Sequence, residues 1–314
     1  MSFTTEIKQE IAIAKLEKHC QKAQLSALIQ LTGSLTISNR NLGLLIRSES
    51  PTTSKRIVFL LKELYDVDTE LVIGKKTNLK KNNVYTIEIK QNAREILEDL
   101  KLMNQGSIQS HPGYEIVSRN CCASNYLAGA FLAYGSCNDP QNSNYHLEIS
   151  LAKIDYANFI VKLISRFDMQ GKIVKRRTRY IVYLKKADYI SDFLALIGAH
   201  DAMMRFEDER IGRDLKNSIS RIDNCEIANE EKIIRAGERQ ITFINRIIEK
   251  GKFSKLPEKL RNVADIRIRY PEASLLELCE YYQKAYGEVV SKSGMKHRLN
   301  KLENIAETLE TYYE

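Results

Sequence analysis

Apolar positions along the chain predict amphipathic helices in two matching places. Between Ser54 and Tyr65 they recur with the one-sided spacing of a helix that lies on a sheet. The same spacing predicts a second helix over residues 157–167, whose apolar positions are Ala157, Ile160, Val161, Ile164 and Phe167. A β-rich run follows each helix, LVIGKKTNLKKNNVYTIEIK in the first case and GKIVKRRTRYIVYLKK in the second. Each run predicts a hairpin with a basic turn.

These two places belong to an internal duplication. Leu61–Val72 aligns with Leu163–Val174 at an offset of 102 residues. Each half is expected to hold a helix, a strand, a second helix, a two-strand hairpin and a closing helix. The opening helices, Leu25–Gly33 and Leu127–Gly135, are apolar on nearly all sides and carry small residues at matched positions. Because small residues let helix backbones approach closely, we expect these two helices to pack together at a pseudo-twofold axis.

From about Asp201 the pattern changes to that of long polar helices. Residues 201–250 contain no proline, which predicts one or two long helices. Isoleucines that recur every seven residues suggest a packed helix face. Glu230 and Gly237, however, interrupt the second apolar position that a coiled coil requires. Packing against the chain's own domains is the favoured interpretation, and dimerisation is the alternative. The isoleucines are Ile227, Ile234, Ile241 and Ile248, with Ile244 and Ile247 beside them.

The last segment predicts three short helices that form a helix-turn-helix. Pro257 and Pro271 bracket the first helix. Ser274 followed by Glu277 is a capping box that begins the second. Ser291 is the expected N-cap of the third helix, and the buried stripe of that helix is Met295, Leu299, Leu302, Ala306 and Leu309.

The third helix has a basic N-terminal end, where a recognition helix meets base edges and phosphates. No acid occurs there before Glu303. The turn before it, from about Lys284 to Val290, is expected to exceed the usual three or four residues. A solvated helix on a three-helix bundle is the alternative. Candidate DNA-binding residues are Ser291, Lys292, Ser293, Lys296, His297, Arg298 and Lys301, within a helix-turn-helix that spans Ser274 to Thr308.

Charge adds a second candidate surface. The 314 residues include 48 Lys and Arg and 40 Asp and Glu, a net charge of +8 whose surplus lies within residues 1–200. A basic surplus favours polyanions such as nucleic acid. Basic hairpins would add phosphate contacts, although exposed turns are also often basic for solubility. The candidate accessory contacts are Lys75, Lys76, Lys80, Lys81, Lys172, Lys175, Arg176, Arg177 and Arg179.

Neither a cofactor nor a metal site is predicted from residue spacing. The cysteines occur without CxxC spacing and the five histidines without metal-ligand spacing, so we expect reduced, mostly buried thiols. No stretch approaches the ~20 apolar residues of a membrane helix, which favours a cytoplasmic protein, with a monomer as the default. The six cysteines are Cys20, Cys121, Cys122, Cys137, Cys225 and Cys279.

The paired nonapeptides LSALIQLTG and LAGAFLAYG resemble the motifs of single-chain LAGLIDADG homing endonucleases. In those nucleases the eighth motif position carries the carboxylate that holds catalytic magnesium, and here it is Thr32 in one copy and Tyr134 in the other. A hydroxyl or a phenol cannot replace an anionic oxygen ligand of Mg²⁺, so no catalytic residue is expected. A metal-dependent nuclease with displaced ligands is the alternative, for which Asp139 and Glu148 are nearby acids.

Almost the whole chain resembles the WhiA family of Gram-positive bacteria. The stretches that carry the resemblance include CCASNYLAGAFLAYGSCNDP, YHLEIS, ISDFLALIGAH, NSISRIDNCEIAN and VSKSGMKHRL. The resemblance implies an α+β fold in which duplicated LAGLIDADG-like units at about 1–105 and 120–200 form one pseudo-twofold domain, residues 1–200. A helical linker at 201–250 and an all-α helix-turn-helix domain at 251–314 would follow.

The same resemblance implies a function. It indicates a non-enzymatic, nucleoid-associated protein that binds double-stranded DNA and acts in transcriptional control, cell division and chromosome segregation, and in sporulation where spores form. Another transcription or division protein is a candidate partner. A division-machinery adaptor with incidental DNA binding is a further alternative.

Overall fold

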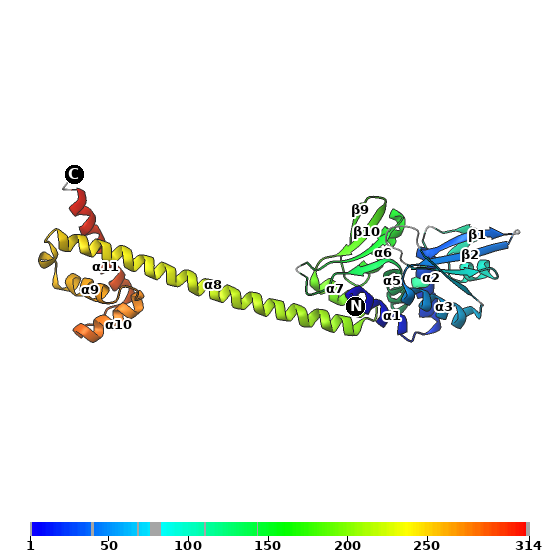
Figure 1. Ribbon diagram of the computed structural model, residues 1–314, viewed down its shortest axis with the longest axis horizontal. Helices are drawn as coiled ribbons and strands as arrows, with labels where there is room; N and C mark the ends of the chain where they lie inside the picture. The colour runs from blue at the N-terminus through cyan, green and yellow to red at the C-terminus, as the bar shows by residue number, and fades with distance from the viewer. Residues whose placement is uncertain are drawn as a thin grey trace. The chain divides into compact units, whose positions relative to one another are not determined.

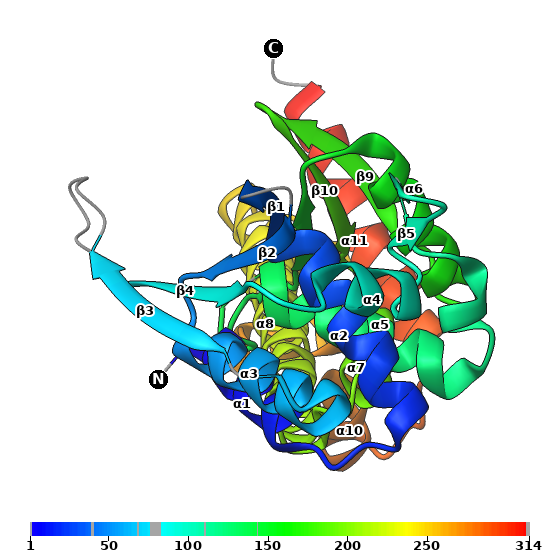
Figure 2. The ribbon, with the colours of Figure 1, turned by 90° about the vertical axis from the view of Figure 1, so that its right-hand side faces the viewer.

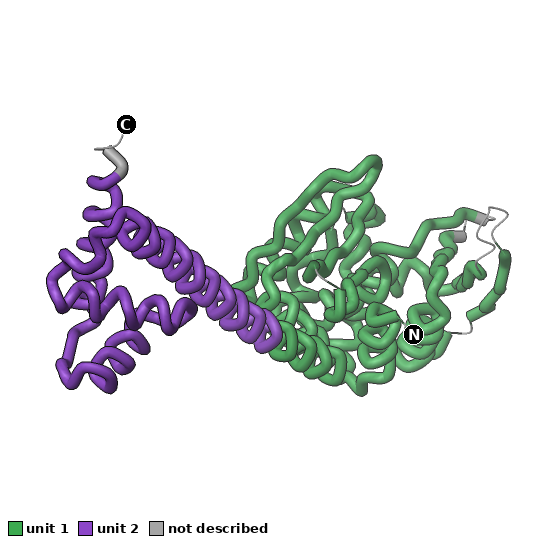
Figure 3. The backbone as a smooth tube through the Cα atoms, turned by 60° about the vertical axis from the view of Figure 1, so that its left-hand side comes forward, with its two compact units in different colours: residues 1–213 green, residues 214–314 purple. Residues whose placement is uncertain are grey.

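The computed structural model describes residues 2–38, 41–67, 69–75, 83–109, 111–142 and 144–311. The chain divides into two compact units, residues 1–213 and 214–314 (Figure 3). The first unit has the expected α+β class and the second is helical. Helix α8 (His200–Glu249) is one continuous helix, and the unit boundary falls within its span.

From their opening helices α2 and α5 onward, the two halves of the first unit contain the same elements in the same order. The first half consists of α1 (Phe3–Ile13), α2 (Lys18–Thr32), β1 (Gly33–Ser38), β2 (Asn41–Ser48), α3 (Pro51–Tyr65), β3 (Glu70–Lys75), β4 (Asn83–Ile89) and α4 (Ala93–Asp99). The second consists of α5 (Asn120–Tyr134), β7 (Gly135–Cys137), β8 (Leu147–Leu151), α6 (Ile154–Ser165), β9 (Lys172–Arg176), β10 (Arg179–Leu184) and α7 (Ala187–Leu196). Between the halves lie β5 (Met103–Asn104), β6 (Ser107–Ile108) and the 3₁₀ turn η1 (Tyr114–Val117).

The expectation of one strand after each opening helix was wrong, because each half has two. Gly33 and Gly135 end the opening helices with extended backbone, so the chain passes directly from each helix into a strand. That strand pairs antiparallel with the next, β1 with β2 and β7 with β8. Strand β7 has three residues, too few for alternation of apolar and polar positions to reveal it.

Each half forms a four-stranded antiparallel sheet with equivalent strand order, β1-β2-β4-β3 and β7-β8-β10-β9. Cross-strand partners lie on the same face of a sheet. Ile46 pairs with Ile87 in the first sheet and Val182 with Ile149 in the second, and all four are buried against the helices. Alternate positions lie on the open face. The matching topology confirms the duplication.

The opening helices of the two halves, α2 and α5, pack side by side in the first unit (Figure 1, Figure 2). Their backbones approach so closely that a Cβ added at Gly129 would lie 2.4 Å from the carbonyl oxygen of Gln24 and 2.9 Å from Cβ of Ala27. The small residues at matched positions therefore perform the role expected from the sequence.

The second unit packs three short helices against the C-terminal part of α8. The turn after α9 packs directly against Gly237 of α8. A Cβ added at Gly237 would clash with the carbonyl oxygen of Pro271. Ile244 and Ile247 are buried and Ile241 is half-buried, as the expected intramolecular packing requires. That expectation is wrong for Ile227, Ile234 and Ile248, which are exposed. The elements after α8 are η2 (Phe253–Lys255), α9 (Glu258–Arg269), α10 (Leu275–Tyr286) and α11 (Lys292–Thr311).

Candidate nucleic-acid interface

A short loop that begins at Gly287 joins helices α10 and α11. Ser274 and Glu277 form the predicted capping box, in which the Ser274 hydroxyl accepts from the Glu277 amide and the Glu277 carboxylate accepts from the Ser274 amide. Helix α10 extends to Tyr286 and ends at Gly287, whose φ of +69° suits glycine. The turn is therefore residues 287–291, shorter than the predicted segment from Lys284 to Val290 but longer than the usual three or four residues, as expected.

The two faces of α11 differ as its sequence predicts. Ser291 caps its N-terminus, where the hydroxyl accepts a hydrogen bond of 3.1 Å from the Gly294 amide. The buried stripe is Met295, Leu299, Leu302 and Ala306, with Leu309 partly buried. Six of the seven candidate DNA-binding residues are exposed and share the N-terminal half of the helix: Ser291, Lys292, Ser293, Lys296, His297 and Lys301.

The seventh candidate, Arg298, also belongs to α11, but its side chain contacts the turn before the helix. Its side chain is only 18% exposed, and its guanidinium donates a 3.0 Å hydrogen bond to the Glu288 carboxylate and lies 5.3 Å from the ring centroid of Tyr282. The Tyr282 hydroxyl and the Lys259 ammonium donate to the same carboxylate, at 3.2 and 3.1 Å. Hydrogen bonds from Arg298 and Lys259 lower the pKa of Glu288. The Arg298 side chain therefore holds the turn in place and is not exposed on the surface of α11 as the other six candidates are.

In the first unit, Thr32 and Tyr134 occupy the positions of the nuclease acids. They are the last residues of helices α2 and α5. The Thr32 hydroxyl donates to the carbonyl of Leu28 at 2.7 Å, and the guanidinium of Arg179 lies 4.8 Å from the Tyr134 ring centroid. Four basic side chains and one acidic side chain line the two adjacent cavities: Lys8, Arg47, Lys153 and Arg179, and Glu49.

This charge pattern favours an anion rather than Mg²⁺. Burial disfavours the charged form of Lys8 and lowers its pKa to about 8. A nearby phosphate would favour the charged form and offset this effect of burial. The acids considered as displaced ligands are already in ion pairs, Asp139 with Arg205 at 3.3 Å and Glu148 with Arg176 at 3.7 Å. Neither is among the described residues that line the two cavities.

The basic residues of the second hairpin divide between the two faces of its sheet. Lys172 pairs with Tyr183 and Arg176 with Arg179, and these positions lie on the open face. Lys175 pairs with Tyr180 on the helix-covered face, and its ammonium lies 5.8 Å from the centroid of that ring. The alternation of a β-strand causes this separation.

The remaining basic candidates lie in turns or at a sheet edge. Arg177 is in the turn between β9 and β10, with φ of +55°. Lys75 ends β3 opposite Asn83, whereas Lys76, Lys80 and Lys81 lie outside the described residues.

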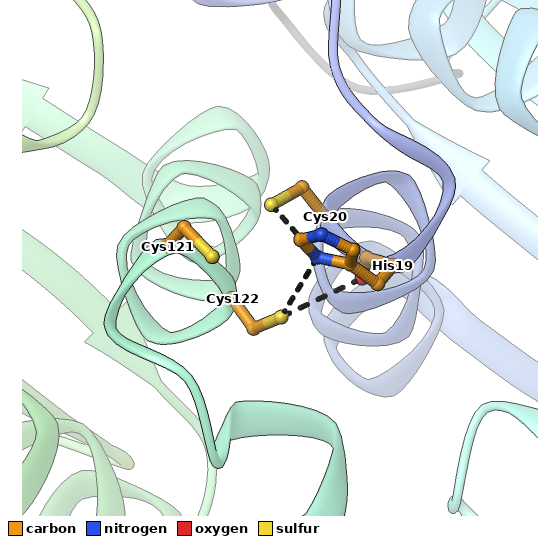
Figure 4. Close-up of side chains that lie close together, drawn as sticks. All are labelled: His19, Cys20, Cys121 and Cys122. Atoms are coloured by element: carbon orange, nitrogen blue, oxygen red, sulfur yellow. Dashed lines mark hydrogen bonds between the residues drawn. The ribbon is translucent and has the colours of Figure 1, made fainter.

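The fold also assembles a side-chain cluster that sequence spacing did not reveal. His19 and Cys20 lie in the first turn of α2, and Cys121 and Cys122 in the first turn of α5 (Figure 4). A signal was present, because the two pairs are related by the same offset of 102 residues that defines the duplication.

None of the described helices has the length and apolar content needed to cross a bilayer.

Family models match three successive parts of the chain. The model described as the WhiA N-terminal LAGLIDADG-like domain matches residues 18–103, and that of the WhiA LAGLIDADG-like domain matches residues 123–216. The model of the WhiA C-terminal HTH domain matches residues 219–306.

Similar proteins cover nearly the full length. The probable cell division proteins WhiA of Bacillus velezensis and Bacillus subtilis are each 45% identical over 312 residues, which is 99% of this chain and 98% of either relative. The crystal structure of full-length DUF199/WhiA from Thermotoga maritima shares the fold, with a TM-score of 0.60 and 24% identity over 98% of this chain and 99% of that one.

Proposed function

This chain belongs to the WhiA family, and we propose that it binds double-stranded DNA at the nucleoid and regulates transcription during cell division and chromosome segregation, without cutting the DNA. The observation that carries the proposal is the exposed face of α11. Lysines, serines and a histidine gather there ahead of the first acid, Glu303, at the positive end of the helix dipole.

Three groups of side chains have separate roles in this proposal. Lys292, Lys296 and Lys301 supply positive charge to phosphates and base edges, while the small Ser291 and Ser293 let the helix approach the duplex. Arg298 positions α11 by fixing the turn through Glu288 and Tyr282. Because that turn is held before DNA arrives, little ordering remains to oppose binding.

The first unit is proposed as an accessory contact surface. Lys172 and Arg176 on the open face of the second sheet would meet phosphates, and the basic side chains around Thr32 and Tyr134 would do the same. Without a carboxylate at either motif position, the metal that activates water and neutralises phosphoryl charge has no expected ligand there.

One experiment tests both DNA selection and the absence of cleavage. The full chain is incubated with sheared genomic DNA in Mg²⁺ buffer, and the retained fragments are sequenced for identity and for their ends. We expect a few intact promoter-like regions to be enriched. Uniform recovery would favour an adaptor that binds DNA incidentally, and new common ends would indicate a nuclease.

A matched pair of variants ties the result to α11. Replacing Lys292, Lys296 and Lys301 together with Ala should abolish the enrichment. Replacing the exposed Lys216, Lys232 and Lys255 of the same unit removes an equal charge and should preserve it; this control set comes from α8 and η2. Loss of selectivity in both triple variants would argue for a net-charge effect instead of a recognition helix.

A further inference from the structure

Four side chains with soft metal-binding atoms converge at the starts of the two central helices (Figure 4). The ligand atoms of His19, Cys20, Cys121 and Cys122 all lie within 4.8 Å of one another. We propose that the first unit binds one zinc ion there, through Nδ1 of the histidine and the three sulfurs.

The distances suit a tetrahedral ion. Zinc–sulfur bonds of about 2.3 Å and zinc–nitrogen bonds of about 2.0–2.1 Å place tetrahedral ligand atoms roughly 3.4–3.8 Å apart. Nδ1 of His19 lies 3.2 Å from Sγ of Cys122 and 3.3 Å from Sγ of Cys20. Small side-chain rotations therefore suffice to bring all four atoms to bonding distance from one point.

The donor set selects the metal and its role. Three thiolates and one imidazole are the ligands of a structural zinc site, and thiolates discriminate against Mg²⁺ and Ca²⁺. With four protein ligands no coordination position stays open for water or substrate, so the ion stabilises structure and performs no hydrolysis.

A carboxylate already orients the histidine. Nε2 of His19 lies 2.7 Å from Oε2 of Glu17, so the ring proton belongs on Nε2 and the Nδ1 lone pair faces the sulfurs. Glu17 is the N-cap residue of α2, yet in the described structure its side chain makes no capping hydrogen bond. We assign Glu17 as a positioning residue for His19.

The helix ends suit the charge of the complex. A zinc ion with three thiolates carries a net charge of −1, and α2 and α5 both begin at the cluster, so the positive ends of their dipoles adjoin it. The side chain of Arg119, the N-cap residue of α5, contributes a further positive charge two residues before Cys121 in the chain.

The duplication explains why the ligands meet. The pseudo-twofold relation that packs Gly129 of α5 on Gln24 of α2 also brings the residue pair at positions 19 and 20 to its counterpart at 121 and 122. The ion would clamp the N-terminal ends of both helices, whereas Thr32 and Tyr134 lie at their C-terminal ends. Its contribution is therefore to the stability of the first unit.

Metal analysis of the full chain tests this assignment. Protein purified under reducing conditions without chelators should contain close to one zinc per chain by elemental analysis. Replacement of the zinc by Co²⁺ should give the intense visible bands of tetrahedral cobalt and a near-ultraviolet thiolate-to-cobalt band. Cys121→Ser should lose most of the zinc, while Cys225→Ser, which alters an exposed cysteine of the second unit, should retain it.

The positioning role of Glu17 has its own readout. Glu17→Gln should weaken zinc binding by about 10–100-fold in competition with a chromophoric chelator, the usual effect of losing a carboxylate behind a ligating histidine. Glu95→Gln, at an exposed position of α4, should leave the affinity unchanged.

Two results would overturn the proposal. One is a reduced, folded wild-type chain that takes up neither zinc nor cobalt, and the other is a disulfide that joins Cys20 to Cys121 or Cys122 in protein isolated without air. The cobalt spectrum of the unaltered chain decides the matter even when a cysteine variant fails to fold.

Discussion

The guanidinium of Arg298 and the carboxylate of Glu288 are joined by a 3.0 Å hydrogen bond across the turn between α10 and α11. The aromatic ring of Tyr282 lies beneath the guanidinium, and its hydroxyl donates to the same carboxylate. The sequence predicts Arg298 as a DNA-binding residue of α11, but in the structure it positions that helix through Glu288 and Tyr282. Stability and DNA binding should respond differently to changes at neighbouring basic positions.

Arg298→Ala should lower the unfolding temperature of the second unit by about 4–8 °C, the shift expected for a loss near 1 kcal/mol in a small domain. Lys296→Ala should leave that temperature unchanged and weaken DNA binding. Differential scanning calorimetry and a fluorescence binding assay measure the two effects. Additive losses in the Arg298→Ala, Glu288→Gln double variant would show that the two residues are not coupled.

The same carboxylate predicts a pH dependence. Hydrogen bonds from Arg298 and Lys259 lower the pKa of Glu288 in the folded chain, so the unfolded chain binds the proton more readily. Its stabilising contribution is therefore complete above the usual glutamate value of about 4.3 and is lost as the pH falls through the lowered folded value. Thermal unfolding from pH 7 to pH 3 should show a smaller acid loss in Glu288→Gln than in the wild type.

Two glycine substitutions separate close packing from helix propensity. Gly129→Ala should destabilise the first unit by about 1–3 kcal/mol because the new Cβ would clash with the backbone of Gln24. Gly212→Ala should stabilise it by about 0.5–1 kcal/mol, since among the described residues no atom lies within 4 Å of that added Cβ. Urea unfolding of the full chain measures both changes, and equal effects would contradict the close approach of α2 and α5.

The division of the second hairpin between two sheet faces predicts which lysine contributes to DNA affinity. Lys172→Ala should reduce the slope of log affinity against log salt by about one unit, the effect of one lost phosphate contact. Lys175→Ala removes the same charge from the helix-covered face and should leave the slope unchanged. A similar reduction in both variants would mean that the hairpin acts through net charge alone.

The sequence by itself determined those features of the fold that depend on interactions between residues close together in the chain. The 102-residue duplication, the packing of the opening helices through Gly129, the capping box at Ser274 and the buried stripe of α11 all follow from spacing and local hydrogen bonding. These features need information only from residues a few turns apart or from the comparison of two copies.

Tertiary structure alone decided the relations between distant residues. Helix packing decided that the sheet face of Lys175 is covered and that of Lys172 is open, packing against Tyr282 and Glu288 took Arg298 into the turn, and the pseudo-twofold axis brought His19 to Cys122. Periodicity says that a side chain lies on a face, but not what covers that face. Partners separated by a hundred residues become neighbours only when two helices pack, because that contact depends on the shapes of both surfaces.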